Sequence, residues 1–366
     1  MRAALQTMRL RLLGQGAARA HDAAMGRLLG VTDWADIRAI LHQRAGMAPA
    51  GRPLAQRNPG EGRSVFIARG MDYAESRPYQ PGDDMRSMHW QLLARTGKPH
   101  VKLYHEEHAG SWHGLIDIRD TMAFGTRVRT KAQQAARVAL LAAGIQTLAS
   151  PQTMIACTLW RAGGLRGRRF GRGPAAVRRL AAWLMAEPMP GLGAKPQAEG
   201  HAGRADFASW VRLLLARQPS PSRVLLASDW SWGDALTDAA LWRLAAFAEV
   251  LAVRVRDPAE VELPVLPRSW FEDVSGGASG WVEPGQAVRR GYAAAAAKAA
   301  EARARALRGA GVPLGEVFTT NNAAEAMQAM VSATRLRPAA PAGLAAMGPA
   351  TRASPATDAL PQWADP

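Results

Sequence analysis

The sequence contains one cysteine, few lysines and no long apolar run. Cys157 is the single cysteine among 366 residues, which excludes an intrachain disulfide and makes a reducing compartment the default expectation. Arginines interrupt each apolar stretch near the N-terminus, so no secretory signal is visible there. No segment approaches the roughly 18 uninterrupted apolar residues that span a bilayer. We therefore expect a soluble, cytoplasmic protein without a transmembrane segment.

Several catalytic and ligand-binding motifs are also missing. The chain has no Gly-rich loop followed by Lys and Ser or Thr, which excludes a P-loop ATPase, and it has no Gly-x-Ser-x-Gly. His105 and His108 flank two glutamates, but a zinc-binding helix requires His-Glu-x-x-His, and on a strand these imidazoles would point to opposite faces. We identify no catalytic residue and predict no enzyme, with a hydrolase built from scattered Ser, His and Asp residues as an alternative.

Negative charge is scarce relative to positive charge. The chain has 46 Lys and Arg residues against 30 Asp and Glu, a formal net charge of +16 and a pI near 11.2, a balance that suggests nucleic-acid binding. Arginine and alanine are abundant throughout, however, which favours a compositional bias over one binding patch. The densest basic run, Arg166–Arg172, lacks the interleaved aromatics of a base-stacking surface. We interpret it as the turn and edge of a β-hairpin, and keep nucleic-acid binding as an alternative.

From Trp112 onward, short apolar runs alternate with helical patterns. Strands are expected at Ser64–Met71, His100–Glu107, Trp112–Asp117, Thr153–Trp160, Gly164–Arg169, Val224–Asp229 and Val250–Arg256. Helices are expected from Thr32 or Asp33 to His42, at Arg127–Ala149, Pro174–Ala186, Asp206–Ala216, Asp234–Phe247 and Arg289–Arg308, and from Asn321 or Asn322 to Ser332. The alternation predicts an α/β fold with a doubly wound, mainly parallel sheet and helices on both faces.

Composition divides the chain into four regions. Residues 1–63 form an N-terminal helical segment and linker, whose first 30 residues we expect to be a loose helix. Residues 64–110 form a small β-rich elaboration, and residues 111–333 form the α/β domain. Residues 334–366 are rich in Ala, Pro, Thr and Ser, and we expect this tail to be disordered because it has few large apolar residues.

The β-rich elaboration contains a turn followed by a short helix. Pro81-Gly82 favours a tight turn, because proline presets φ at the second turn position and glycine accepts a positive φ at the third. Asp83 is then placed to cap a helix. The apolar residues that follow have helical spacing and predict a buried stripe formed by Met85, Met88 and Leu92.

The charges around this turn are dense and of both signs. They either form an internal ion-pair network or present a polar surface to a partner, and both interpretations stay open. The string Arg77-Pro78-Tyr79-Gln80-Pro81-Gly82-Asp83-Asp84-Met85-Arg86, followed by Trp90 and Ala94-Arg95, resembles the signature of the bacterial domain of unknown function 58 family. Similarity extends from about residue 34 to residue 332. One departure is His89, which stands where the family usually has an acidic residue.

The resemblance implies a fold and a partner. Members of that family resemble von Willebrand factor A domains and are usually paired with MoxR-type AAA+ ATPases. The implied function is a non-enzymatic adaptor that acts with such an ATPase in the assembly or maturation of a client protein. The implied partner-binding residues are those of the signature, namely Arg77, Tyr79, Pro81, Gly82, Asp83, Asp84, Arg86, Trp90 and Arg95.

The resemblance also implies a degenerate metal site. Von Willebrand A domains bind Mg²⁺ through Asp-x-Ser-x-Ser after the first strand, a Thr from a later loop and an Asp after another strand. Here Asp117, Thr121 and Asp229 match, but Arg119 replaces the first hydroxyl, and no Ser or Thr lies between Thr158 and Ser209. We therefore expect no cofactor and no bound metal. We predict instead that the guanidinium of Arg119 bridges Asp117 and Asp229.

Two tryptophans follow the last of these aspartates. Trp230 and Trp232 flank Ser231 on a loop at the presumed binding edge of the sheet. Bulky aromatic residues on such loops often anchor protein interfaces. The alternative is that both rings cover the end of the sheet as part of the core.

Overall fold

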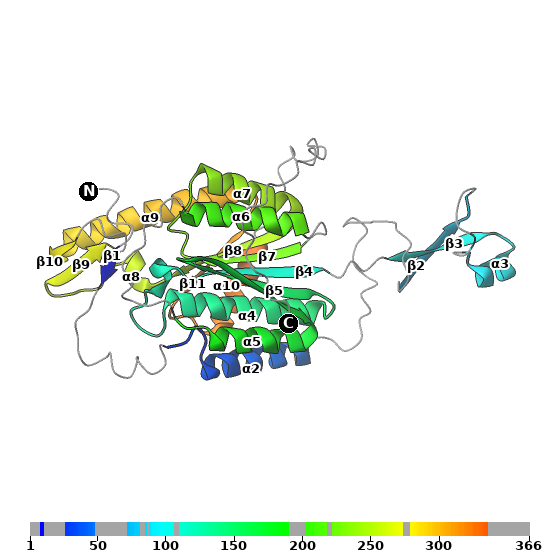
Figure 1. The fold of residues 1–366 in the computed structure, drawn as a ribbon, viewed down its shortest axis with the longest axis horizontal. Coiled ribbons are helices and arrows are strands. Elements are labelled where there is room, and N and C mark those ends of the chain that lie inside the picture. The colour runs from blue at the N-terminus through cyan, green and yellow to red at the C-terminus, as the bar shows by residue number, and fades with distance from the viewer. Residues whose placement is uncertain are drawn as a thin grey trace. The chain divides into compact units, whose positions relative to one another are not determined.

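A computed structural model gives the three-dimensional structure of the protein (Figure 1). It describes residues 8–10, 26–47, 72–80, 85, 88–105, 110–189, 202–217, 222–273 and 279–335. The chain divides into two compact units. The larger unit comprises residues 1–47 and 111–366, and the smaller unit comprises residues 48–110.

The larger unit is built on a six-stranded sheet with the strand order β11-β8-β7-β4-β5-β6. The strands are β4 (Ser111–Asp117), β5 (Met154–Arg161), β6 (Gly164–Arg172), β7 (Ser222–Ser228), β8 (Ala248–Arg256) and β11 (Leu314–Phe318). Every pairing is parallel except that of β6, which is antiparallel to β5. The predicted doubly wound, mainly parallel α/β sheet is confirmed, as is the hairpin formed by β5 and β6.

Helices cover both faces of this sheet. Figure 1 shows α6 (Ala202–Arg217), α7 (Ala235–Phe247) and α9 (Gln286–Gly309) on one face. The other face carries α2 (Val31–Met47), α4 (Lys131–Ala149), α5 (Gly173–Ala186) and α10 (Ala323–Arg335). Because both faces are covered, the central strands are largely apolar, and β4 is buried at each of its positions.

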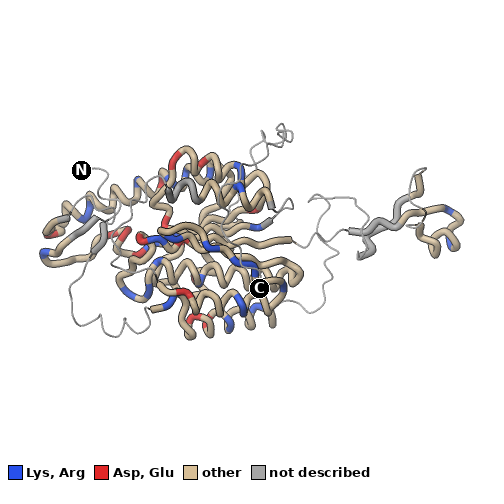
Figure 2. Tube along the Cα trace, viewed as in Figure 1, with Lys and Arg blue, Asp and Glu red and all other residues tan. Residues whose placement is uncertain are grey.

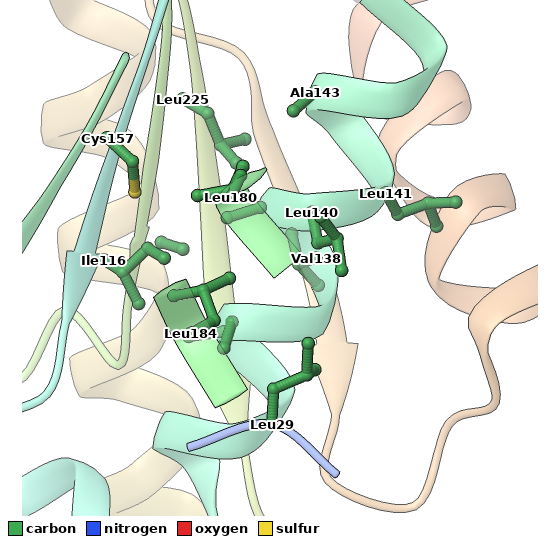
Figure 3. Packing of buried hydrophobic residues seen from close by; sticks show 14 of the residues in the cluster. Leu29, Ile116, Val138, Leu140, Leu141, Ala143, Cys157, Leu180, Leu184 and Leu225 are labelled. Atoms are coloured by element: carbon green, nitrogen blue, oxygen red, sulfur yellow. The ribbon is translucent and has the colours of Figure 1, made fainter. Parts of the chain in front are cut away.

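The alanine-rich helix α4 forms the centre of one core layer (Figure 3). Small residues let it lie between the sheet and the outer helices, and Leu140 on this helix is fully buried. A Cβ added at Gly144 would lie 2.4 Å from Cδ1 of Leu41, so the close approach of α2 depends on this glycine. The helix α2, expected in a separate N-terminal segment, therefore belongs to the larger unit.

The start of α4 differs from the prediction for a local reason. The helix begins at Lys131 and not at Arg127, because Thr130 and Gln133 form a reciprocal capping box. At the start of α10, the predicted cap Asn322 is confirmed, and its side chain accepts a hydrogen bond from the backbone N–H of Glu325 at 2.9 Å.

A second, three-stranded antiparallel sheet was not predicted. It consists of β1 (Met8–Leu10), β9 (Ser269–Asp273) and β10 (Ser279–Val282). The expected loose helix is therefore wrong at residues 8–10, where pairing with β9 makes the backbone a strand. This pairing joins segments far apart in the sequence, and a three-residue strand has no readable periodicity of its own.

The smaller unit contains β2 (Asp72–Pro78), antiparallel to β3 (His100–His105), and the helix α3 (Trp90–Thr96). The strand at His100 is confirmed, and it pairs with β2, which contains Arg77 and Pro78 of the signature. The second strand of this region was predicted at Ser64–Met71. Residues 64–71 lie outside the described residues.

The predicted helix of the signature begins later than expected. Met88 is buried, but Met85 precedes α3 and is 59% exposed, so the predicted three-residue stripe is wrong. The N-cap of α3 is His89, whose Nδ1 accepts a hydrogen bond from the backbone N–H of Leu92 at 3.2 Å. Asp83, the predicted cap, lies outside the described residues.

The buried leucine of α4 gives a first prediction. Leu140→Ala should lower the free energy of unfolding by about 2–5 kcal/mol, because it leaves a cavity between the sheet and the outer helices. Leu236→Ala on α7 is the matched control, since Leu236 is 69% exposed and should change stability by no more than about 0.5 kcal/mol. Urea unfolding followed by circular dichroism measures both, and equal effects would contradict the packing described here.

Candidate functional site

Aspartates lie at the carboxyl ends of three neighbouring parallel strands. Asp117 ends β4, Asp229 follows β7 directly, and Asp257 follows β8 directly. All three side chains are nearly or fully buried. In doubly wound sheets this edge is where ligands bind, so it is the first candidate site. Asp257 was missed in the sequence, although it shows the same signal as the other two.

Asp117 is bound by a cation from its own loop. The Nε and Nη2 atoms of Arg119 donate to the two oxygens of Asp117 at 3.0 and 2.8 Å, and the backbone N–H of Arg119 donates at 3.1 Å. Ser228 at the end of β7 donates its hydroxyl to the same carboxylate at 2.7 Å. Half of the predicted bridge is therefore confirmed, because Arg119 pairs with Asp117. The other half is wrong, because within the described residues the cation bound to Asp229 is Lys131.

The rings of two tryptophans pack against the guanidinium of Arg119. Its Cζ atom lies 3.8 Å from the ring centroid of Trp160 and 5.2 Å from that of Trp232. The indole N–H of Trp232 donates to the hydroxyl of Ser228 at 2.8 Å. A desolvated cation over indole rings is stabilised by about 2 kcal/mol or more. The carboxylate, the hydroxyl and the rings thus fix one orientation of Arg119.

Trp230 lies in the core at this edge. It is buried, its ring stacks on that of Trp232 with centroids 5.3 Å apart, and its indole N–H donates to the backbone oxygen of Val253. Its φ of 56° is in the left-handed region, which costs a residue other than glycine of order 1–3 kcal/mol. Trp230 and Trp232 were expected either to anchor an interface or to cover the end of the sheet as part of the core. This geometry matches the second interpretation.

Asp229 is bound by a lysine that sequence reasoning missed. The Nζ atom of Lys131, at the start of α4, lies 2.9 Å from an oxygen of Asp229 and 2.6 Å from an oxygen of Glu260. Ser231 donates its backbone N–H and its hydroxyl to the other oxygen of Asp229. No local pattern links Lys131 to Asp229, because 98 residues separate them.

The electrostatics of this cluster follow from burial and pairing. Burial alone would raise the pKa of Asp229, but the charge of Lys131 and the hydrogen bonds from Lys131 and Ser231 outweigh it and lower that pKa to about 2. Burial alone would lower the pKa of Lys131, but Asp229 and Glu260 outweigh it and raise the pKa. Both groups are therefore charged at neutral pH.

Asp257 ties three loops together. Its carboxylate accepts hydrogen bonds from the backbone N–H and the hydroxyl of Thr126, at 2.9 and 2.6 Å, and from the hydroxyl of Thr319 at 2.7 Å. It also caps the short helix α8 (Pro258–Val261) through a capping box with Glu260. The third aspartate therefore has a structural role.

The ligand set of a magnesium site is not matched at this edge. Mg²⁺ requires oxygen ligands in octahedral geometry. Here both oxygens of Asp117 and both oxygens of Asp229 accept hydrogen bonds from this chain, in part from the cations of Arg119 and Lys131. The hydroxyl of Thr121, a matching position, is buried without a hydrogen-bond partner among the described residues. Within those residues no cluster of three His, Cys, Asp or Glu side chains is suited to a metal ion.

Hollows lie at both ends of the sheet within the described residues. One of about 220 Å³ lies beside the carboxyl edge and includes Asp120 and Arg161 in its wall. The other, of about 230 Å³, lies at the opposite end of the sheet, where Trp112, Val224 and Val250 start their strands, and its wall is mainly apolar. The thiol of Cys157 is no nucleophile for either, because it is buried and its burial raises its pKa.

The structure describes only part of the predicted signature surface. Tyr79 is half-buried and donates its backbone N–H to the backbone oxygen of Pro99 at 3.0 Å, whereas Trp90 is 58% exposed and Arg95 is exposed. Arg77 pairs with Val101 in the β2–β3 ladder. The remaining signature residues lie outside the described part of the chain, namely Pro81, Gly82, Asp83, Asp84 and Arg86.

The fold and the carboxyl edge of the sheet define the class of the protein. It is a doubly wound α/β protein in which the aspartates at the ends of the strands bind side chains of the same chain. Residues 75–302 match the family described as Protein of unknown function DUF58, and the chain belongs to that family. The predicted family is thereby confirmed. Uncharacterized proteins of Mycobacterium bovis and Mycobacterium tuberculosis are each 30% identical over 266 residues, which span 70% of this chain and 77% of theirs.

Solved structures with partial similarity include BatB from Bacteroides thetaiotaomicron, with a TM-score of 0.35 and 14% identity over 62% of this chain and 99% of that one. An aerotolerance-related membrane protein from Bacteroides fragilis has a TM-score of 0.38 and 11% identity over 62% of this chain and 100% of that one. A von Willebrand factor type A protein from Catenulispora acidiphila has a TM-score of 0.32 and 13% identity over 64% and 43%.

Membrane crossing was tested on the helices of the described segments. None of them combines the length and the apolar character that a bilayer-spanning helix requires.

The lysine at the edge gives the second prediction. Lys131→Met should lower the free energy of unfolding at pH 7 by about 3–5 kcal/mol, because it leaves Asp229 buried without its cation. Lys298→Met on α9 is the matched control, since Lys298 is exposed and its loss should change stability by no more than about 0.5 kcal/mol.

The pH dependence of the two proteins should have opposite signs. In the wild type the lowered pKa of Asp229 contributes stability that is complete above an unfolded value of about 3.9 and is lost as pH falls through about 2. In Lys131→Met only the hydrogen bonds from Ser231 oppose burial, so the pKa of Asp229 should rise and stability should fall as pH rises above about 4. Urea unfolding between pH 3 and 7 measures the slopes, and parallel slopes would refute the pairing of Lys131 with Asp229.

Proposed function

We propose that the protein is a non-enzymatic adaptor that binds a MoxR-type AAA+ ATPase and a client protein whose assembly or maturation it serves. The partnership is carried over from the family resemblance of the signature, and membership in the family supports it. A reducing compartment, such as the cytoplasm, fits the single buried cysteine.

The proposal that the protein is not an enzyme rests on one observation. The carboxylates at the ends of the strands are already paired with other side chains of the protein. A general acid or base must reach a substrate, and a nucleophile must be free to attack. Asp117 and Asp229 instead bind cations of this chain, and the hydroxyl of Ser228 bonds to Asp117 and to Trp232. These groups hold the edge of the sheet together. The proposal therefore assigns no cofactor and no metal to the site.

The contact surface for the ATPase is assigned to the signature of the smaller unit. Trp90 on α3 exposes 58% of its surface, although tryptophan is among the largest apolar side chains. Exposed aromatic residues near arginine are typical anchors of protein interfaces, and Arg95 lies on the same helix. The signature sequence also contains the acidic pair Asp83 and Asp84, which lie outside the described residues.

Affinity purification from native cells tests the partnership. The wild-type protein should recover a MoxR-type AAA+ ATPase, identified by mass spectrometry. Trp90→Ala should reduce that recovery by about tenfold or more, as the loss of an interface anchor does. The matched control is Trp242→Ala on α7, because Trp242 is 42% exposed in the larger unit and its loss should leave recovery unchanged.

Two results would reject the proposal. Recovery of no AAA+ ATPase with the wild-type protein would remove the proposed partner. Equal recovery with wild type, Trp90→Ala and the double variant Asp83→Ala/Asp84→Ala would show that the signature does not contact it.

A further inference from the structure

The strand β6 is one edge of the central sheet. It pairs with β5 on one side, and no other strand of the described chain pairs with it. A strand in this position presents a row of backbone N–H and C=O groups that can pair with another extended chain. The opposite edge strand, β11, is parallel to its neighbour, so β6 is the antiparallel edge of the sheet.

A bulge limits the regular part of this edge. The register between β5 and β6 shifts at Ile155 and Ala156, and Gly171 has a φ of 81°. The guanidinium of Arg179 on α5 binds the backbone oxygen of Phe170 at 2.8 Å. The backbone available for pairing is therefore the segment 164–169, about the length of an ordinary strand.

The charge along this edge has one sign. No Asp or Glu lies between Arg161 and Glu187, and six arginines lie in that stretch. In Figure 2 blue recurs along this edge of the sheet. Arg166 binds the buried carboxylate of Glu187. The other exposed arginines near the edge include Arg169, Arg172 and Arg178, for which the described residues provide no ion-pair partner.

We infer that β6 binds an extended acidic polypeptide segment by strand addition. Backbone hydrogen bonds to segment 164–169 provide the affinity, and carboxylates of the added segment pair with the exposed arginines, Arg169 and Arg172 among them.

A polypeptide fits this edge better than a nucleic acid. Phosphates would pair with the arginines and could accept from the outward backbone N–H groups, but a sugar-phosphate backbone has no N–H to donate to the outward C=O groups. Base stacking would need exposed aromatic rings, and the aromatic residue of the strand, Phe170, is buried against Trp183. The described part of this edge has exposed arginines but no exposed aromatic ring. This favours a partner that carries carboxylates on an extended polypeptide chain.

The inference goes beyond the proposed function, because β6 belongs to the larger unit and the signature belongs to the smaller one. Loss of ATPase recovery in the signature variants therefore says nothing about the β6 surface, and binding of a peptide to β6 involves no ATPase. Either proposal can fail while the other stands.

Fluorescence anisotropy with three labelled probes tests strand addition. The first probe is an alternating Glu-Thr peptide of about eight residues, the length of a strand. The second is the same peptide with alternate backbone amides N-methylated, which keeps the charge but removes the backbone donors. The third is an oligothymidylate with the same number of charges. The peptide should bind, and the other two should bind at least about tenfold more weakly.

Charge reversal on the protein locates the surface. Arg169→Glu/Arg172→Glu should weaken binding of the peptide by at least about tenfold. Arg243→Glu/Arg290→Glu is the matched control, because these arginines are exposed on α7 and α9 and their reversal changes the net charge equally. Absence of peptide binding, equal binding of the N-methylated peptide, tighter binding of the oligonucleotide, or equal weakening by both double variants would each overturn the inference.

Discussion

The structure depends on the neutralisation of carboxylates buried at the ends of parallel strands. An ionised carboxylate that leaves water loses several kcal/mol unless a cation and hydrogen bonds replace its hydration. Asp117 and Asp229 are both in this situation, and each receives a basic side chain, Arg119 in one case and Lys131 in the other. Removal of either cation would leave a buried carboxylate that keeps hydrogen bonds but has lost its counter-ion.

This neutralisation determines what the edge of the sheet can do. Arg119 lies against Trp160 and Trp232, and the hydroxyl of Ser228 bonds to Asp117, so polar groups and rings close the edge around one guanidinium. Lys131 joins α4 to the loop after β7 through Asp229 and to α8 through Glu260. The ion pairs at the carboxyl edge of the sheet therefore stabilise the fold. We assign the recognition of partner proteins to two other surfaces, around Trp90 and along β6.

The sequence predicted what is local or periodic. The parallel strands and most helices follow from apolar runs and caps, and the pair of Arg119 with Asp117 follows from a motif position two residues away. The ion pair of Lys131 with Asp229 and the strand at residues 8–10 could not be predicted from local sequence. In each case the two segments that pair are far apart in the chain. The start of α3 was misplaced because His89, a weak cap by propensity, accepts the capping hydrogen bond.

Isothermal titration of magnesium chloride into the purified protein tests the central claim most directly. No magnesium-dependent heat is expected in the wild type, because Arg119 and Lys131 already neutralise the carboxylates that would bind the ion. A clear magnesium-dependent heat in the wild type that disappears in Asp117→Ala would contradict it.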